Sequence, residues 1–164
     1  MSIKTFFIAL LVAVPVVGLS VSASAQHRTV KKVTPAKSAK VTVEQIYSLI
    51  NKHRTSVGLK PLKMNAAICK EADMHSRNMA SGKVPFGHDG FDGRSDRLMA
   101  AIKGANASGE NVEYTTGDAE RVVYNWLHSP VHKKNIEGDF DLTGIGIATS
   151  SSGQAYYTQI FIKN

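Results

Sequence analysis

The apolar residues of this sequence change their spacing near residue 140, and that change constrains the fold more than any other feature. In several stretches between residues 42 and 136 they recur every three or four positions, which predicts amphipathic helices. From Leu142 onward they alternate with small residues, and two such runs flank a turn at residues 150–153, which predicts a β-hairpin. Helices followed by a hairpin predict an α+β domain in which the helices pack on an antiparallel sheet.

Local signals place the starts of four helices. The first has a capping box, in which a Thr and a Gln stand three residues apart. Each of the others follows a residue whose side chain can accept a hydrogen bond from the first turn. The predicted caps are Thr42 (with Gln45), Asn65 and Ser129, the last followed by a proline suited to a first turn, and one further helix is predicted to follow Gly117 and Asp118.

The first 25 residues have the pattern of a secretory signal. A lysine near the start precedes an uncharged apolar run, and an Ala-Ser-Ala sequence before Gln26 matches the site that a signal peptidase reads. The run is too short to span a membrane comfortably. We therefore expect residues 1–25 to be removed, no transmembrane segment to remain, and the protein to be secreted to the periplasm or the cell exterior.

Residues 26–40 carry five Lys or Arg and no acid, and they lack helical or strand periodicity. We expect a disordered basic linker that either attaches to anionic cell-envelope polymer or acts as a solvated spacer. Residues 41–164 hold 14 Lys or Arg against 13 Asp or Glu, so the expected globular domain is nearly neutral. A nucleic-acid-binding domain needs a basic face, and this segment has no surplus to form one.

Cys69 is the only cysteine of the chain. A single cysteine cannot close an intramolecular disulfide, so a domain bound for an oxidising compartment must be held together by packing. Cys69 itself is expected to be an inert thiol. His75, Trp126 and Tyr47 stand at apolar positions of the predicted helices and are expected to be packing residues.

Residues that could carry chemistry gather in the irregular stretch 82–117. Glycines flank His88 and precede Glu110, which predicts backbone turns that direct both side chains into a cleft. With His132 they supply two imidazoles and one carboxylate, a set that could form an open zinc site. The charged residues 89–97 are interpreted as a solvated loop or, as the alternative, as a segment that orders the rim of the cleft.

Six segments of residues 41–164 stand in an order and spacing that chance does not explain. They are INKHRTSVGLKPLKMN (50–65), ADMHSRNMASGKVPFGHDGFDGRSDRL (72–98), SGEN (108–111), VVYNWLHSPVHKKNI (122–136), TGIGIA (143–148) and YYTQIF (156–161). Together they resemble the bacterial branch of the CAP superfamily, the cysteine-rich secretory, antigen 5 and pathogenesis-related proteins. The resemblance implies a three-layer α-β-α sandwich with a central antiparallel sheet and a polar His/Glu tetrad in its cleft.

Two tetrad positions match the pattern of the eukaryotic relatives. His88 corresponds to the first cleft histidine and Glu110 to the carboxylate of the Gly-Glu-Asn motif. Ser129 stands where many eukaryotic relatives have Glu, with His132 one turn later, and Tyr156 stands where they have His. The resemblance therefore implies at most three metal ligands, namely His88, Glu110 and His132, and a weakly held, exchangeable zinc ion.

The sequence favours a binding module for a small ligand, a lipid or a divalent cation. The alternative is a hydrolase in which His88 or Glu110 is the general base and Ser129 or a metal-activated water is the nucleophile. A helix-capping role for Ser129 would commit its hydroxyl and count against that alternative. A structural or adhesion role carried by residues 26–40 is a third possibility. The expected cleft residues are His88, Glu110, Asn111, Ser129, His132 and Tyr156.

Overall fold

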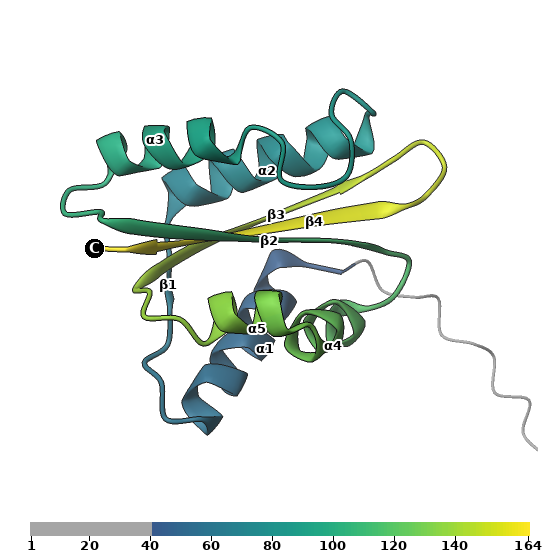
Figure 1. Ribbon diagram of the computed structural model, residues 1–164. Helices are drawn as coiled ribbons and strands as arrows, with labels where there is room; N and C mark the ends of the chain where they lie inside the picture. Colours follow the sequence, from purple (N-terminus) through teal and green to yellow (C-terminus); the bar gives the residue numbers. More distant parts are fainter. Residues whose placement is uncertain (1–40) are drawn as a thin grey trace, which may run out of the picture. The chain divides into compact units, whose positions relative to one another are not determined.

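A four-stranded sheet organises residues 41–164, the part of the chain that this computed structural model describes. The expected signal segment (1–25) and linker (26–40) lie outside the described residues. The elements are, in chain order, α1 (Val43–Ser56), β1 (Lys63–Met64), α2 (Ala66–Ala80), α3 (Phe91–Ala101), β2 (Ala107–Thr115), α4 (Ala119–His128), α5 (Pro130–Ile136), β3 (Leu142–Thr149) and β4 (Ala155–Lys163) (Figure 1).

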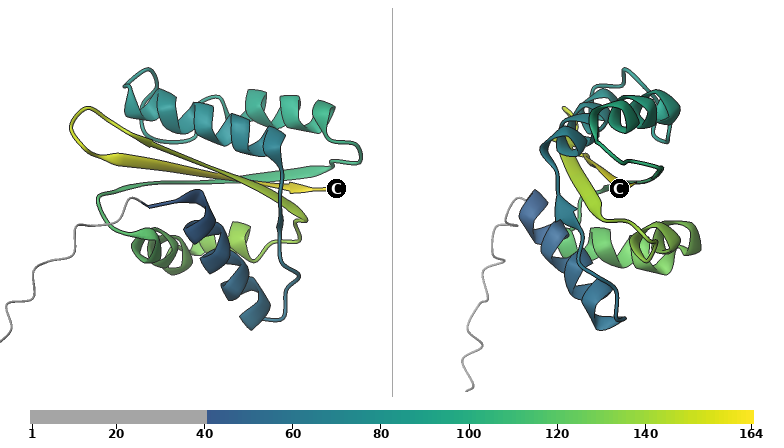
Figure 2. Two further views of the ribbon diagram at one scale, coloured as in Figure 1. Left: turned by 180° about the vertical axis from the view of Figure 1, so that it is seen from behind. Right: turned by 90° about the vertical axis from the view of Figure 1, so that its left-hand side faces the viewer.

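The strand order across the sheet is β1-β3-β4-β2. The predicted hairpin is β3–β4, and β2 pairs antiparallel with β4 along its whole length. The short β1 runs parallel to β3. Helices α2 and α3 cover one face of the sheet, and α1, α4 and α5 cover the other, as the views in Figures 1 and 2 agree. The predicted α+β class and three-layer sandwich are confirmed, and only the β1–β3 pairing departs from an antiparallel sheet.

Each face of the sheet has its own apolar core. Trp126 and Phe161 are fully buried between the sheet and the α1, α4 and α5 layer. On the other face, Ile160 packs with residues of α2 and α3. Gly144 and Gly146 of β3 face α2, and a Cβ at either position would collide with the backbone of that helix. The glycines of the TGIGIA segment therefore allow α2 to lie directly on the sheet.

The helix caps follow the sequence prediction except at Ser129. Thr42 forms the capping box with Gln45, Asn65 accepts from the first turn of α2, and Asp118 accepts from Arg121. Ser129 occupies the cap position of α5, but its side chain makes no capping hydrogen bond. The first turn of α5 is closed by the Ser129 carbonyl, which accepts from the N–H of Lys133. The expectation that capping commits the Ser129 hydroxyl is therefore wrong.

A buried arginine fixes the end of α5 to α1. Arg54 is 2% exposed, and its guanidinium donates to the carbonyls of Ile136, Gly138 and Phe140, and also to that of Lys60. Burial lowers the pKa of Arg54, and nearby carboxylates oppose that shift. These bonds satisfy carbonyls that would otherwise be buried without partners.

The sequence predicted an irregular stretch at residues 82–117, and that prediction is wrong. The stretch contains α3 and β2. Helix α3 has no side-chain cap, since Gly90 in the left-handed region precedes it. Its buried residues are Arg94 and Leu98, which do not form an apolar stripe. In the middle of β2, two polar residues, Glu110 and Asn111, are buried. The sequence therefore lacks the alternation of apolar and polar residues that is usual for a strand. Both elements therefore lack their ordinary sequence signals.

Candidate functional site

A buried carboxylate lies at the centre of the site. Glu110 is on β2, directly opposite Ile160 of β4, so its side chain points toward α2 and α3. Arg94 of α3 binds it with a fork of two bonds, from Nε to Oε2 at 2.9 Å and from Nη2 to Oε1 at 2.8 Å. The Arg94 side chain is 7% exposed and the Glu110 side chain is 1% exposed. Glu110 is therefore a desolvated anion with a fixed counterion.

Arg94 is the functional neighbour that the sequence interpretation missed. It does not belong to a solvated charged loop, because it lies on the buried face of α3, four residues before Leu98. Its Nη1 also donates to the carbonyl of Asp89 at 2.8 Å, so the same guanidinium holds the segment next to His88. The four-residue spacing from an apolar residue was the one signal that could have placed Arg94 on a buried face.

His88 reaches Glu110 from the loop between α2 and α3. Its Nδ1 lies 2.9 Å from Glu110 Oε1, and its side chain is half exposed. The loop is anchored by His75, a buried histidine of α2, whose Nε2 donates to the Gly87 carbonyl at 2.8 Å. Gly87 and Gly90 both have positive φ, which confirms the turns predicted on either side of His88. Gly109, by contrast, lies within β2 and makes no turn before Glu110.

Asn111 connects β2 to α5 on the other face of the sheet. Its Nδ2 donates to the His132 carbonyl at 3.0 Å, and its Oδ1 accepts from Asn135 at 2.9 Å. Asn135 also donates to the Glu110 carbonyl. Asn111 therefore lies in a strand and holds helix α5 through its side chain.

His132 lies on α5, which covers the other face of the sheet from α2 and α3. Burial lowers the pKa of His132, and the nearby His88 lowers it further. Among the described residues, its ring makes no hydrogen bond with Glu110, whose carboxylate partners are Arg94 and His88. The structure therefore does not bring His132 onto the Glu110 carboxylate.

The donor set does not fit a resident metal ion. Within residues 41–164, no group of three His, Cys, Asp or Glu side chains is arranged to hold one. Glu110 Oε2 accepts from Arg94, and Oε1 accepts from both Arg94 and His88. A zinc ion at Glu110 would have to displace the guanidinium and remain beside its positive charge. The zinc site expected from His88, Glu110 and His132 is therefore not supported by the chemistry of these side chains.

Tyr156 joins an aromatic cluster. Its ring lies 6.1 Å from that of Tyr114 and 6.5 Å from that of Phe86, measured between centroids, and Phe86 meets Tyr114 edge-on at 4.8 Å. We call these three residues the aromatic cluster. In the described part of the chain, the Tyr156 hydroxyl makes no hydrogen bond to Glu110. The sequence interpretation did not include Phe86 or Tyr114, because Tyr114 meets Tyr156 through strand pairing and Phe86 reaches them from the loop before α3.

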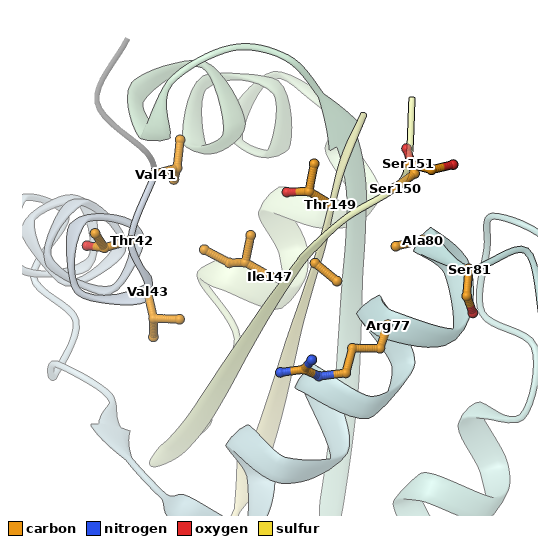
Figure 3. A pocket seen from close by; sticks show the side chains of 11 residues that line it. Val41, Thr42, Val43, Arg77, Ala80, Ser81, Ile147, Thr149, Ser150 and Ser151 are labelled. Carbon is orange, nitrogen blue, oxygen red and sulfur yellow. The ribbon is translucent and has the colours of Figure 1, made fainter. Parts of the chain in front are cut away.

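The large cavity drawn in Figure 3 is separate from these residues. It has a volume of about 880 Å³ and is lined by the start of α1, the C-terminal end of α2 and the end of β3 (Figure 3). Val41, Arg77, Ile147 and Ser150 are among its lining residues, whereas His88, Glu110 and Ser129 are not. This cavity was not expected from the sequence.

The free energy of unfolding is expected to fall as the pH drops below about 6.5, the ordinary pKa of histidine. Burial lowers the pKa of His75 and of His132, so the unfolded chain binds protons there that the folded chain does not. The stabilisation is complete above about 6.5 and is lost at lower pH, with a slope of up to about 1.4 kcal/mol per pH unit for each histidine. Urea unfolding at several pH values measures this slope.

The variant His75→Gln tests the share of His75 in this slope, because glutamine can still donate to the Gly87 carbonyl but cannot titrate. It should flatten the dependence, and His128→Gln, at an exposed histidine, is the matched control. An equal slope in wild-type protein and His75→Gln would show that His75 does not carry the effect.

The family comparisons agree with this architecture. A family model described as CAP, the cysteine-rich secretory protein family, matches residues 47–161. The Bacillus subtilis protein YkwD is 30% identical over 147 residues, which cover 86% of this chain and 56% of YkwD. The matched region thus spans little more than half of that relative.

Three solved structures that share the fold are bacterial proteins. A cysteine-rich secretory protein of Staphylococcus aureus superposes with a TM-score of 0.60 at 25% identity, covering 74% of this chain and 38% of that one. An extracellular protein with an SCP domain from Bacillus anthracis superposes with a TM-score of 0.59 at 30% identity, covering 74% of this chain and 40% of that one. An outer surface protein of Borrelia burgdorferi superposes with a TM-score of 0.62 at 21% identity, covering 74% of this chain and 91% of that one, and it shows the shared fold alone.

Within the described residues of this chain, no helix has both the length and the apolar character needed to cross a membrane.

Proposed function

The chain belongs to the cysteine-rich secretory protein family, and on that premise we propose that it is a secreted binding module whose ligand site is centred on His88 and Glu110. Relatives with the same fold are named as extracellular or outer-surface proteins, which supports a place at or outside the cell envelope. Residues 26–40 would add a salt-sensitive attraction to anionic envelope polymer through their five positive charges.

The observation that carries the proposal is the way His88 is held. Glu110 fixes its Nδ1, and Arg94 fixes Glu110, so the imidazole is oriented before any ligand arrives. The side chain is nevertheless 50% exposed, and within residues 41–164 its Nε2 has no hydrogen-bond partner. That nitrogen accepts a hydrogen bond when the ring is neutral and donates one when the ring is protonated. A ligand can therefore be recognised there without a metal ion.

The arrangement supports binding better than hydrolysis. A carboxylate that orients a histidine also occurs in nucleophilic enzymes, but those place a hydroxyl or thiol within hydrogen-bond reach of the imidazole. Among the described residues, neither the Ser129 hydroxyl nor any other hydroxyl is bonded to His88. The alternative of a Ser/His hydrolase therefore has no observation in its favour.

The test is a nuclear magnetic resonance titration with four probes: tetra-N-acetylglucosamine, inorganic phosphate, octanoate and zinc chloride. At least one of the first three should shift the His88 ring signals saturably, while zinc should cause no saturable shift. The variant His88→Ala should weaken that binding about tenfold, the loss of one good hydrogen bond.

His128→Ala, at an exposed histidine elsewhere, is the matched control and should bind as the wild type does. The proposal fails if none of the three non-metal probes reaches His88, or if His88→Ala and His128→Ala bind equally well. A saturable zinc shift at His88 would restore the metal hypothesis in its place.

A further inference from the structure

We propose that the aromatic cluster (Phe86, Tyr114 and Tyr156) is a platform on which the pyranose rings of a surface polysaccharide stack, adjacent to His88. The inference rests on the proposed function, because it names the ligand class of that site. It also has consequences of its own, since the cluster could bind sugar rings whether or not His88 takes part.

The cluster is assembled from three segments that are distant in the chain. Tyr114 of β2 and Tyr156 of β4 are directly opposite each other in the strand register, with ring planes 27° apart. Phe86 approaches Tyr114 edge-on from the loop that carries His88. Phe86 is 45% exposed and Tyr114 is 51% exposed, and none of the three belongs to either apolar core. Rings that contribute so little to the core but cluster at the surface are typical of a binding site.

The cluster and His88 share one surface. Glu110, Val112 and Tyr114 occupy every second position of β2. The side chains of Glu110 and Tyr114 therefore point to the same face of the sheet. Phe86 lies two residues before His88, and the bond from His75 to Gly87 holds the short segment between them. A ligand that lies along the loop can therefore contact the rings and the free His88 nitrogen together.

The chemistry of this surface matches a sugar chain better than an acyl chain. The faces of aromatic rings are electron-rich, and the C–H groups on a pyranose face carry partial positive charge, so the two attract. The hydroxyls of a sugar also need hydrogen-bonding partners at the edge of such a platform. The tyrosine hydroxyls, the exposed Lys83 and Asp89 of the same loop, and His88 provide them. An acyl chain would leave these polar groups without water or a partner.

The experiment is a calorimetric titration of the protein with tetra-N-acetylglucosamine. Phe86→Ala and Tyr114→Ala should each weaken binding about tenfold, since each removes one stacking surface. Tyr114→Phe should retain most of the affinity, because it keeps the ring. Tyr124→Ala is the matched control, because Tyr124 is also 51% exposed but lies on α4 and is stacked on His128. Thermal unfolding of each variant separates lost binding from lost structure.

Absence of binding to the wild type, or equal affinity in Phe86→Ala and Tyr124→Ala, would overturn the proposal. Phe86-dependent binding to phosphatidylglycerol vesicles without sugar binding would also overturn it, in favour of a lipid surface. If sugar binding depends on the rings and none of the three non-metal probes shifts the His88 signals, the platform stands and the proposed His88 site fails. If phosphate or octanoate shifts His88 and the sugar does not bind, the site stands and the platform fails.

Discussion

Alanine at Gly144 or Gly146 is expected to reduce the free energy of unfolding by about 3 kcal/mol or more, at the upper end of overpacking effects. A Cβ at Gly144 would meet the backbone of Ile68 and Cys69, and one at Gly146 would meet the backbone of Ala72 and Asp73. A side chain can rotate away from a collision, but the backbone of a helix cannot. The sheet and α2 would have to separate, which opens the whole apolar layer between them. Urea unfolding of each variant measures the loss.

Gly93→Ala is the matched control for these substitutions. Gly93 lies inside α3, and a Cβ there would make only an ordinary contact at 3.5 Å with the end of the Arg97 side chain. Since alanine is the better helix former, this variant should gain about 0.5–1 kcal/mol. If Gly144→Ala and Gly93→Ala unfolded at the same urea concentration, the close approach of α2 to β3 would not exist in solution.

Loss of Arg94 is expected to destabilise the protein as much as alanine at Gly144 or Gly146 does, because it leaves the Glu110 carboxylate buried without its counterion. Arg94→Leu should reduce the free energy of unfolding by about 3–5 kcal/mol, the range found when one partner of a buried ion pair is removed. Glu110→Gln should cost a comparable amount, because the buried guanidinium then lacks its charged partner. The geometry predicts strong coupling, since one fork of two bonds joins these side chains.

A double-mutant cycle measures that coupling. The variant with both Arg94→Leu and Glu110→Leu should lose less stability than the two single leucine substitutions added together, because neither charge is then left buried alone. His88→Ala is the comparison, since half of that side chain is exposed and its loss should change the stability little. Simple additivity in the Arg94 and Glu110 cycle would show that the two residues do not act as a pair.

Stability and binding should therefore separate within one site. Arg94 and Glu110 are buried and hold the structure together, while His88 and the aromatic cluster are exposed and available to a ligand. We expect Arg94 variants to fail chiefly by unfolding. Variants at His88, Phe86 and Tyr114 should fold and lose binding.

The helix starts and the hairpin were predictable because their signals are local. A capping residue acts within three or four positions, as Thr42 and Gln45 do, and a β-hairpin joins segments that are neighbours in the chain. The same local rules failed for α3, whose start has no side-chain cap and whose buried face includes an arginine.

The candidate site was predictable only in part. The flanking glycines indicated His88, and the resemblance carried by the Gly-Glu-Asn segment indicated Glu110. No local pattern indicated Arg94, which contacts the Glu110 carboxylate and the segment next to His88. Arg94 lies 16 residues before Glu110, and the contact exists only once α3 packs beside β2. Without that contact, the Glu110 carboxylate would be free to join His88 and His132 as a metal ligand.

By itself, the sequence determined the α+β class, the starts of most helices and the hairpin. These features depend on periodicity, on capping and on turns, which act over a few residues. Only the tertiary structure decided that Arg94 neutralises Glu110, that Tyr156 meets Tyr114 and Phe86, and that the Ser129 hydroxyl makes no cap bond. The physical reason is that charge pairing and ring packing depend on distance in space. That distance is set by how α3, β2 and β4 pack and pair, which no local pattern in the sequence specifies.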